Sequence, residues 1–281
     1  MFYLLSKKYE NFGTGFASVI GQLFTRPSML KTPKHTNQNP PKEQLQVIIN
    51  LFLQGKLQQV LDKTSQMLKQ FPNSAILYNF LGTTNVALKQ FSPAINNYNN
   101  SIKINPCYAE SYNKLGLVLD EIKEFDAAIE NFKKALEINP NYGEAHYNMG
   151  NSLLNKNQPN AAINSYKIAL EIQPNYSEVY NNMGLALRDI GRPKDAIKSY
   201  KHCLNLNPKS AETYYNMGMI LQDQGKQEAA IESYKKTIKI NPNYVKAYNN
   251  IGILLEEIGD TDGAIANFKM AIEICPDYDS A

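Results

Sequence analysis

Four asparagines recur along this chain at a fixed interval of 34 residues: Asn148, Asn182, Asn216 and Asn250. An asparagine amide offers N–H donors and a carbonyl acceptor, the same pair of groups that an extended peptide backbone presents. A row of such amides on one surface would therefore hold a peptide main chain without reading its side chains. This is chemistry for binding, and it predicts a polypeptide ligand.

Residues suited to nucleophilic or metal chemistry are scattered. The histidines, His35, His146 and His202, have no partners at motif spacing. Cys203 follows His202, but other parts of the chain place alanine at the equivalent position, which predicts a buried structural thiol. The three cysteines form no CxxC pair, so neither a zinc site nor a disulfide framework is indicated. We expect no catalytic residue, no metal site and no cofactor, and therefore no enzyme.

The charge distribution argues against nucleic acid as the main partner. Of 29 basic and 26 acidic side chains, residues 1–40 hold five and one, which leaves 24 and 25 in residues 41–281. A nearly neutral body has no evident face for neutralising phosphates, so no nucleic acid is expected as a partner.

Residues 1–40 read as a leader separate from the rest of the chain. Apolar residues between Phe12 and Phe24 fall at helical spacing, but three glycines interrupt them and the stretch is too short to span a bilayer. We expect no membrane span, and a disordered leader with a polar, proline-rich linker at residues 32–41. The unpaired cysteines favour a cytoplasmic location, with a targeting segment in the leader as the alternative.

The rest of the chain is a sevenfold repeat. Prolines stand at 72, 106, 140, 174, 208, 242 and 276, each step being 34 residues. If this proline is numbered 32, the array covers residues 41–278, in the units 41–74, 75–108, 109–142, 143–176, 177–210, 211–244 and 245–278. Residues 279–281 then begin a further unit or end the chain. Positions within a unit are numbered in this frame.

Small and large residues hold fixed positions in the units. In six units, position 8 is glycine, position 20 is alanine and position 24 is tyrosine or phenylalanine. A glycine inside a helix costs about 1 kcal/mol relative to alanine, so its recurrence indicates a close approach between two helices. The aromatic ring at position 24 is expected to fill the remaining space.

Each unit is predicted to form two antiparallel helices of roughly 13 residues. Position 15 is glycine or asparagine in five units, residue types that accept the left-handed backbone with which helices end. The proline at position 32 then prevents the second helix from continuing. One such pair is too small to bury its apolar faces, so the pairs must stack on one another.

This pattern resembles the tetratricopeptide repeat. It is carried by the aromatic residue at position 4 (as in Tyr78 and Tyr180), glycine at 8, alanine at 20, an aromatic residue at 24 and proline at 32. The chain departs from the pattern in having no tryptophan, in His146 at position 4 of the fourth unit, and in Ile48 at position 8 of the first. The resemblance implies an all-α fold, a right-handed α-solenoid of seven 34-residue helix-turn-helix repeats.

In the tetratricopeptide family, positions 2, 5, 6, 9, 12 and 13 of the first helices point into a concave groove. The four asparagines occupy position 6, and the array resembles the asparagine-lined repeat region of protein O-linked N-acetylglucosamine transferases. Positions 12 and 13 are mostly acidic here, which favours a ligand with basic residues. The resemblance therefore implies a peptide-binding groove made by Asn148, Asn182, Asn216, Asn250, Asp120, Arg188, Asp189, Asp223 and Glu256.

Three functions are consistent with these observations. The first is a noncatalytic protein–protein interaction scaffold that holds an extended peptide or partner segment in the groove. The second is the N-terminal substrate-recognition region of a larger transferase, of glycosyltransferase or sulfotransferase type, and the third is an RNA-binding helical repeat. The plain alternative for the asparagines is that tandem duplication repeated a surface residue. The last repeat carries no closing polar helix, so an oligomer formed through its apolar edge is also expected.

Overall fold

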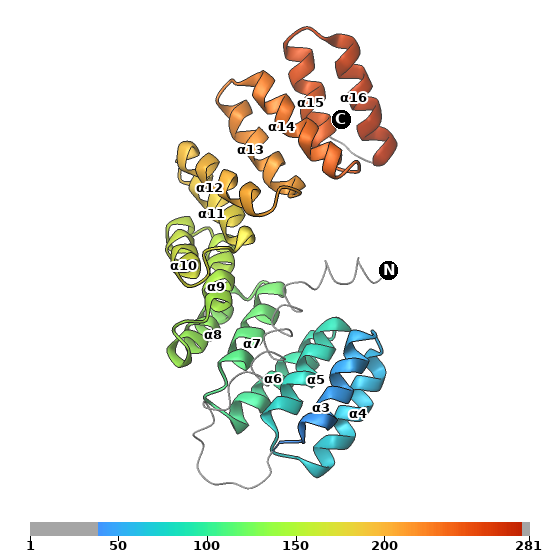
Figure 1. Ribbon diagram of the computed structural model, residues 1–281, viewed down its shortest axis with the longest axis vertical. Helices are drawn as coiled ribbons and strands as arrows, with labels where there is room; N and C mark the ends of the chain where they lie inside the picture. Colours follow the sequence, from blue (N-terminus) through green and yellow to red (C-terminus); the bar gives the residue numbers. More distant parts are fainter. Residues whose placement is uncertain (1–38, 277–281) are drawn as a thin grey trace. The chain divides into compact units, whose positions relative to one another are not determined.

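The computed structural model describes residues 39–276, and this range holds fourteen α-helices and no β-strand. The helices form seven consecutive pairs (Figure 1). The first helices of the pairs are α3 (Lys42–Leu53), α5 (Ala75–Ala87), α7 (Ala109–Glu121), α9 (Gly143–Asn155), α11 (Ser177–Asp189), α13 (Ala211–Asp223) and α15 (Val245–Glu257). The second helices are α4 (Leu57–Gln70), α6 (Phe91–Ile104), α8 (Phe125–Ile138), α10 (Pro159–Ile172), α12 (Pro193–Leu206), α14 (Gln227–Ile240) and α16 (Thr261–Ile274).

The predicted all-α fold of seven helix-turn-helix repeats is confirmed. Expectations about the leader and about residues 277–281 lie outside the described range. Within that range, no helix is long and apolar enough to cross a membrane.

The first helix of each pair ends at a residue with left-handed backbone at position 15. Gly191 illustrates the turn: its φ is +71°, its N–H donates to the carbonyl of Arg188 at 2.9 Å, and the N–H of Arg192 donates to that of Leu187 at 2.9 Å. Lys89 and Lys123 adopt the same conformation, with φ of 59° and 66°. Tertiary packing therefore imposes this turn even where the residue type does not favour it.

Glycine at position 8 and the aromatic ring at position 24 are in direct contact. A Cβ added to Gly184 would lie 2.3 Å from Cε1 of Tyr200, a distance that real atoms do not allow. The ring of Tyr200 is fully buried, as is Ala196 at position 20. The close approach predicted from the sequence is therefore present, and similar contacts recur in four other described repeats.

The first repeat exchanges the sizes of the residues at these two positions. Ile48 stands where the other repeats have glycine, and Thr64 stands where they have an aromatic ring. Both side chains are fully buried. The larger side chain is thus supplied by the first helix and the smaller one by the second.

The chain divides into two compact units, one ending at Ser152 and the other beginning at Leu153, both within α9. In the first unit, an apolar cluster joins α3, α4 and α5 through residues that include Ile49, Met67 and Phe80. In the second unit, a corresponding cluster joins α14 and α15 through Tyr234, Ile251 and Leu254. These clusters show that a helix pair within a unit obtains part of its dry interior from the next pair.

Candidate functional site

An amide at position 5 of one repeat binds an amide at position 6 of the next. In the first unit, Asn148 donates through Nδ2 to Oδ1 of Asn113 at 3.0 Å. In the second unit, Asn216 donates through Nδ2 to Oδ1 of Asn181 at 3.3 Å. The two partners are 35 residues apart in both cases, so the bond joins neighbouring first helices.

A glutamate at position 2 of the following repeat orients the position 5 amide. Nδ2 of Asn113 donates to Oε1 of Glu144 at 3.4 Å. Nδ2 of Asn181 donates to Oε1 of Glu212, also at 3.4 Å. Because an ionised carboxylate only accepts hydrogen bonds, the NH₂ group must face it, and the amide oxygen is left for the position 6 asparagine.

The same arrangement thus occurs once in each unit. We call it the amide triad, formed by Asn113, Glu144 and Asn148 in the first unit and by Asn181, Glu212 and Asn216 in the second. Neither the position 2 glutamates nor the position 5 asparagines are among the groove residues predicted from the sequence. The signal that identifies the triad is the recurrence of asparagine at position 5, followed 31 and 35 residues later by glutamate and asparagine.

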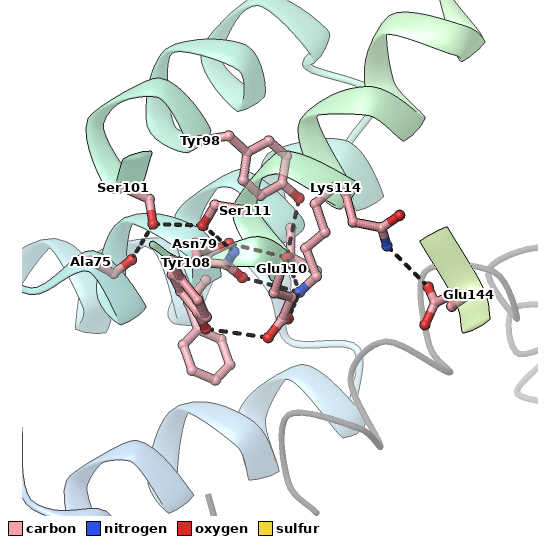
Figure 2. Close-up of polar contacts among 12 residues, drawn as sticks. Ala75, Asn79, Tyr98, Ser101, Tyr108, Glu110, Ser111, Lys114 and Glu144 are labelled. Atoms are coloured by element: carbon pink, nitrogen blue, oxygen red, sulfur yellow. Dashed lines mark hydrogen bonds and ion pairs between the residues drawn. The ribbon is translucent and has the colours of Figure 1, made fainter. Parts of the chain in front are cut away.

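Between α5 and α7 a lysine takes the place of the position 6 asparagine (Figure 2). Nζ of Lys114 donates to Oδ1 of Asn79 at 3.0 Å and to Oγ1 of Thr83 at 3.1 Å. It also forms an ion pair of 2.7 Å with Glu110, at position 2 of the same repeat, and both side chains are largely buried. In the triads the position 2 glutamate orients an amide, whereas in this repeat the same position, Glu110, neutralises the buried cation of Lys114.

A buried polar network surrounds this ion pair. Tyr108 donates to Oε2 of Glu110 at 3.3 Å, and Asn79 donates to Oγ of Ser111 at 2.9 Å, as Figure 2 shows. Burial, followed by the charge of Glu110, raises the pKa of the Tyr108 hydroxyl well above its usual range. The phenol therefore remains a hydrogen-bond donor at every physiological pH.

Glu144 is the acid of the first triad, and its environment favours protonation. Burial is the largest cause and the negative charge of Glu110 the second, while Lys114 and the hydrogen bond from Asn113 act in the opposite direction. Together they raise the pKa of Glu144 to about 7. The orientation of this triad is therefore coupled to pH near neutrality.

The four position 6 asparagines differ in exposure and in partners. Asn148 and Asn216 are 4% and 6% exposed, whereas Asn182 and Asn250 are partly exposed. Asn250 donates to the hydroxyl of Tyr234 at 3.1 Å and to that of Tyr215 at 3.4 Å. Oδ1 of Asn182 accepts from Nδ2 of Asn181 at 3.2 Å. These side chains are therefore fixed within the fold by their neighbours.

The charged candidate residues fall into two groups. Asp120 accepts a hydrogen bond from Ser152, and Arg188 lies 3.3 Å from its neighbour Asp189, so these side chains have protein partners. Arg188 also reaches the sulfur of Met219, in the next repeat, at 3.8 Å. The remaining two candidates are the exposed carboxylates Asp223 and Glu256.

The adjacent residues His202 and Cys203 lie in different environments. Cys203 is 2% exposed and its sulfur lies 3.2 Å from the hydroxyl of Thr213, while burial raises the pKa of its thiol. His202 instead stacks on Tyr180, at the surface, with ring centroids 5.3 Å apart. A thiol with a raised pKa is a poor nucleophile, so Cys203 is a structural residue.

Family models for this repeat match most of the array. A model described as TPR repeat matches residues 82–122, 150–191, 184–225 and 220–259. Models described as tetratricopeptide repeat match residues 109–142, 245–278 and 131–164. No curated protein matches the chain significantly.

Solved structures with the same architecture are numerous. The crystal structure of MamA is 33% identical, covers 57% of this chain and 94% of its own, and has a TM-score of 0.54. YrrB, described as a TPR protein with an unusual peptide-binding site, is 23% identical, with coverages of 65% and 94% and a TM-score of 0.53. Pseudomonas aeruginosa pilF is 19% identical, with coverages of 73% and 94% and a TM-score of 0.65. With a period, a packing pattern and family models that all agree, this chain belongs to the tetratricopeptide repeat family.

Proposed function

We propose that this protein is a noncatalytic protein-interaction scaffold that holds an extended polypeptide segment against its first helices. The observation that carries the proposal is the amide triad, which fixes a position 6 asparagine in the same way in both units. An amide that is already oriented loses little conformational entropy when it binds a ligand.

The triad uses only part of the hydrogen-bonding capacity of each position 6 amide. Asn148 and Asn216 each use one N–H on the preceding repeat, and Asn250 directs its NH₂ group to two tyrosine hydroxyls. Within residues 39–276, the carbonyl oxygens of these three asparagines accept no hydrogen bond. A free acceptor of fixed direction suits the N–H group of a peptide backbone.

The spacing of the first helices suits an extended ligand. Packed helices lie about 10 Å apart and an extended chain advances about 3.3 Å per residue, so Asn182, Asn216 and Asn250 of the second unit would meet roughly every third residue. The exposed carboxylates Asp189, Asp223 and Glu256 add electrostatic preference for basic residues in that ligand. Arg188, the exception, lies beside Asp189.

The comparisons support this proposal at the level of the fold. YrrB is described as having a peptide-binding site, and a peptide ligand for the present chain agrees with that description. No specific observation among the described residues favours the alternative of a transferase recognition region.

Replacing Asn148, Asn182, Asn216 and Asn250 together with alanine tests the proposal. The variant should lose the proteins that the native chain captures in a pull-down, while circular dichroism shows unchanged helix content. A matched control replaces four exposed asparagines of second helices, Asn96, Asn100, Asn160 and Asn205, and should capture the same proteins as the native chain. Equal capture by the two variants would contradict the proposal.

The expected self-association can be tested on α16. Ile265 and Ile272 of this helix are 46% and 48% exposed, which places them among the most exposed isoleucines of residues 39–276. If these side chains meet a second copy, the variant Ile265→Lys/Ile272→Lys should sediment as a monomer where the native chain sediments as a larger species. A native chain that is itself monomeric at micromolar concentration would exclude this contact.

A further inference from the structure

A hollow of about 320 Å³ opens among α10, α11 and α12, all within the second unit. Its apolar lining comes from Ile163 of α10 and from Tyr180, Met183 and Leu187 of α11. Its charged lining comes from Lys167, Arg192, Asp195, Lys198 and His202. An apolar floor beneath a basic rim is the composition of a binding site rather than of a packing defect.

The hollow is separate from the face that carries the asparagines. Tyr180, Met183 and Leu187 follow one another at intervals of three and four residues, so they share one side of α11. Asn182 is two residues from Tyr180, which places it about 200° around the helix. A ligand in the hollow would therefore leave Asn182, the position 6 asparagine of the same helix, unoccupied.

The basic rim results from a departure from the repeat pattern. In the third and sixth repeats, a glutamate at position 22 forms an ion pair with a lysine at position 26: Glu130 with Lys134 at 3.2 Å, and Glu232 with Lys236 at 2.9 Å. In the fifth repeat the same positions hold Lys198 and His202. Lys198 therefore places a cation at position 22, where the third and sixth repeats have a carboxylate paired with a lysine.

The remaining charges of the rim do not restore neutrality. Asp195 forms an ion pair of 2.6 Å with Arg192, so its charge is already matched. Within residues 39–276, Lys167 and Lys198 form no ion pair, and both are exposed. His202 is held over the hollow by stacking on Tyr180. Two lysines therefore face any ligand without a protein counter-charge.

We propose that this hollow is a second binding site, which takes an acidic segment of a partner protein with one bulky apolar side chain. The apolar side chain enters the hollow and contacts Met183 and Leu187, while flanking carboxylates contact Lys167 and Lys198. The basic rim of the hollow selects an acidic segment. Asp189, Asp223 and Glu256, on the face that carries the asparagines (the inner face), select a basic one. The protein would then hold two segments of opposite charge on opposite sides of α11.

The test uses a short fluorescein-labelled peptide with a central phenylalanine flanked by glutamates, and fluorescence anisotropy reports its binding to the full chain. The variant Lys198→Glu/His202→Lys introduces the pair that α14 already carries, so its helix should form normally. We expect its affinity to fall about tenfold or more, because a neutral glutamate–lysine pair replaces the unpaired ammonium of Lys198. Lys239→Gln on α14 lowers the formal charge by the same amount away from the hollow and should leave the affinity unchanged.

Three results would overturn the proposal. The first is the absence of saturable binding by the native chain, and the second is equal weakening by both charge variants. The third is equal binding of a peptide with serine in place of phenylalanine, because attraction by charge alone does not use the hollow. The four-alanine variant of the inner asparagines should bind the acidic peptide normally, which separates failure of this site from failure of the inner face.

Discussion

Gly184→Ala isolates the contact on which each helix pair depends. The added methyl carbon would lie 2.3 Å from Cε1, 2.7 Å from Cδ1 and 2.8 Å from Cζ of Tyr200. The ring is fully buried between the helices of its pair, so it cannot turn into solvent to relieve the contact. The two helices must separate, or the ring must leave its rotamer.

Two opposing terms determine the size of the effect. Alanine is favoured over glycine in a helix by about 1 kcal/mol, which taken alone would stabilise the variant. Overpacking a dense core costs about 1–3 kcal/mol and more where nothing can yield. Because three ring atoms are approached at once, we expect the steric term to dominate, with a net loss of about 2 kcal/mol in the free energy of unfolding.

Urea and thermal unfolding followed by far-ultraviolet circular dichroism measure this loss. Gly191→Ala is the matched control, because Gly191 belongs to the same repeat, has φ of +71° and has no atom within 4 Å of an added Cβ. Its cost should be about 1 kcal/mol and purely conformational. In Gly191→Asn the cost should nearly vanish, since Asn157 adopts this conformation at the same position with φ of 59°.

A compensating change completes the test. Tyr200→Leu removes the ring atoms that the new methyl meets, so the double variant Gly184→Ala/Tyr200→Leu should be more stable than the sum of its single losses by 1 kcal/mol or more, on the order of couplings between touching residues. A stabilised Gly184→Ala variant, or strict additivity of the two changes, would refute the steric argument.

Three further predictions concern the polar network. The raised pKa of Glu144 means that the folded chain holds this proton more tightly than the unfolded chain, so stability should fall as pH rises from the ordinary 4.5 to about 7. The variant Glu144→Gln should lose this pH dependence and should be about 1–3 kcal/mol more stable than the native chain above pH 7. This gain is smaller than the full pKa shift implies because the carboxyl keeps some solvent contact. Equal pH profiles of the two proteins in urea titrations would count against this prediction. Asn181→Ala should cost about 2–4 kcal/mol in urea unfolding, and Asn216→Ala about 1 kcal/mol, because the former breaks several hydrogen bonds and the latter one; equal losses would contradict the triad. Lys114→Met should cost about 3–5 kcal/mol by leaving Glu110 buried without its cation, and a second change, Glu110→Gln, should recover most of that loss in thermal melts; no recovery would show that packing dominates.

The sequence by itself determined the local units of this protein and their packing layers. A period of 34 residues, with glycine at position 8 and an aromatic ring at position 24, specifies seven helix pairs, because backbone propensity and side-chain volume act over short distances. Even the exchange of sizes at Ile48 and Thr64 could be read as a first-repeat exception. The left-handed turn at Lys89 could not be read from residue type, since only the surrounding contacts impose it.

Tertiary structure alone decided which polar groups meet. The sequence places asparagines in register, but whether Asn148 bonds to a ligand or to Asn113 depends on the distance between neighbouring first helices. Likewise, Lys198 and His202 read as ordinary surface residues until α10 and α11 supply the apolar floor beside them. The 34-residue period determines which residues each repeat contains. The side-chain hydrogen bonds between repeats, the burial of each residue and the local charge depend on two or three neighbouring repeats, so they are decided only when the repeats stack.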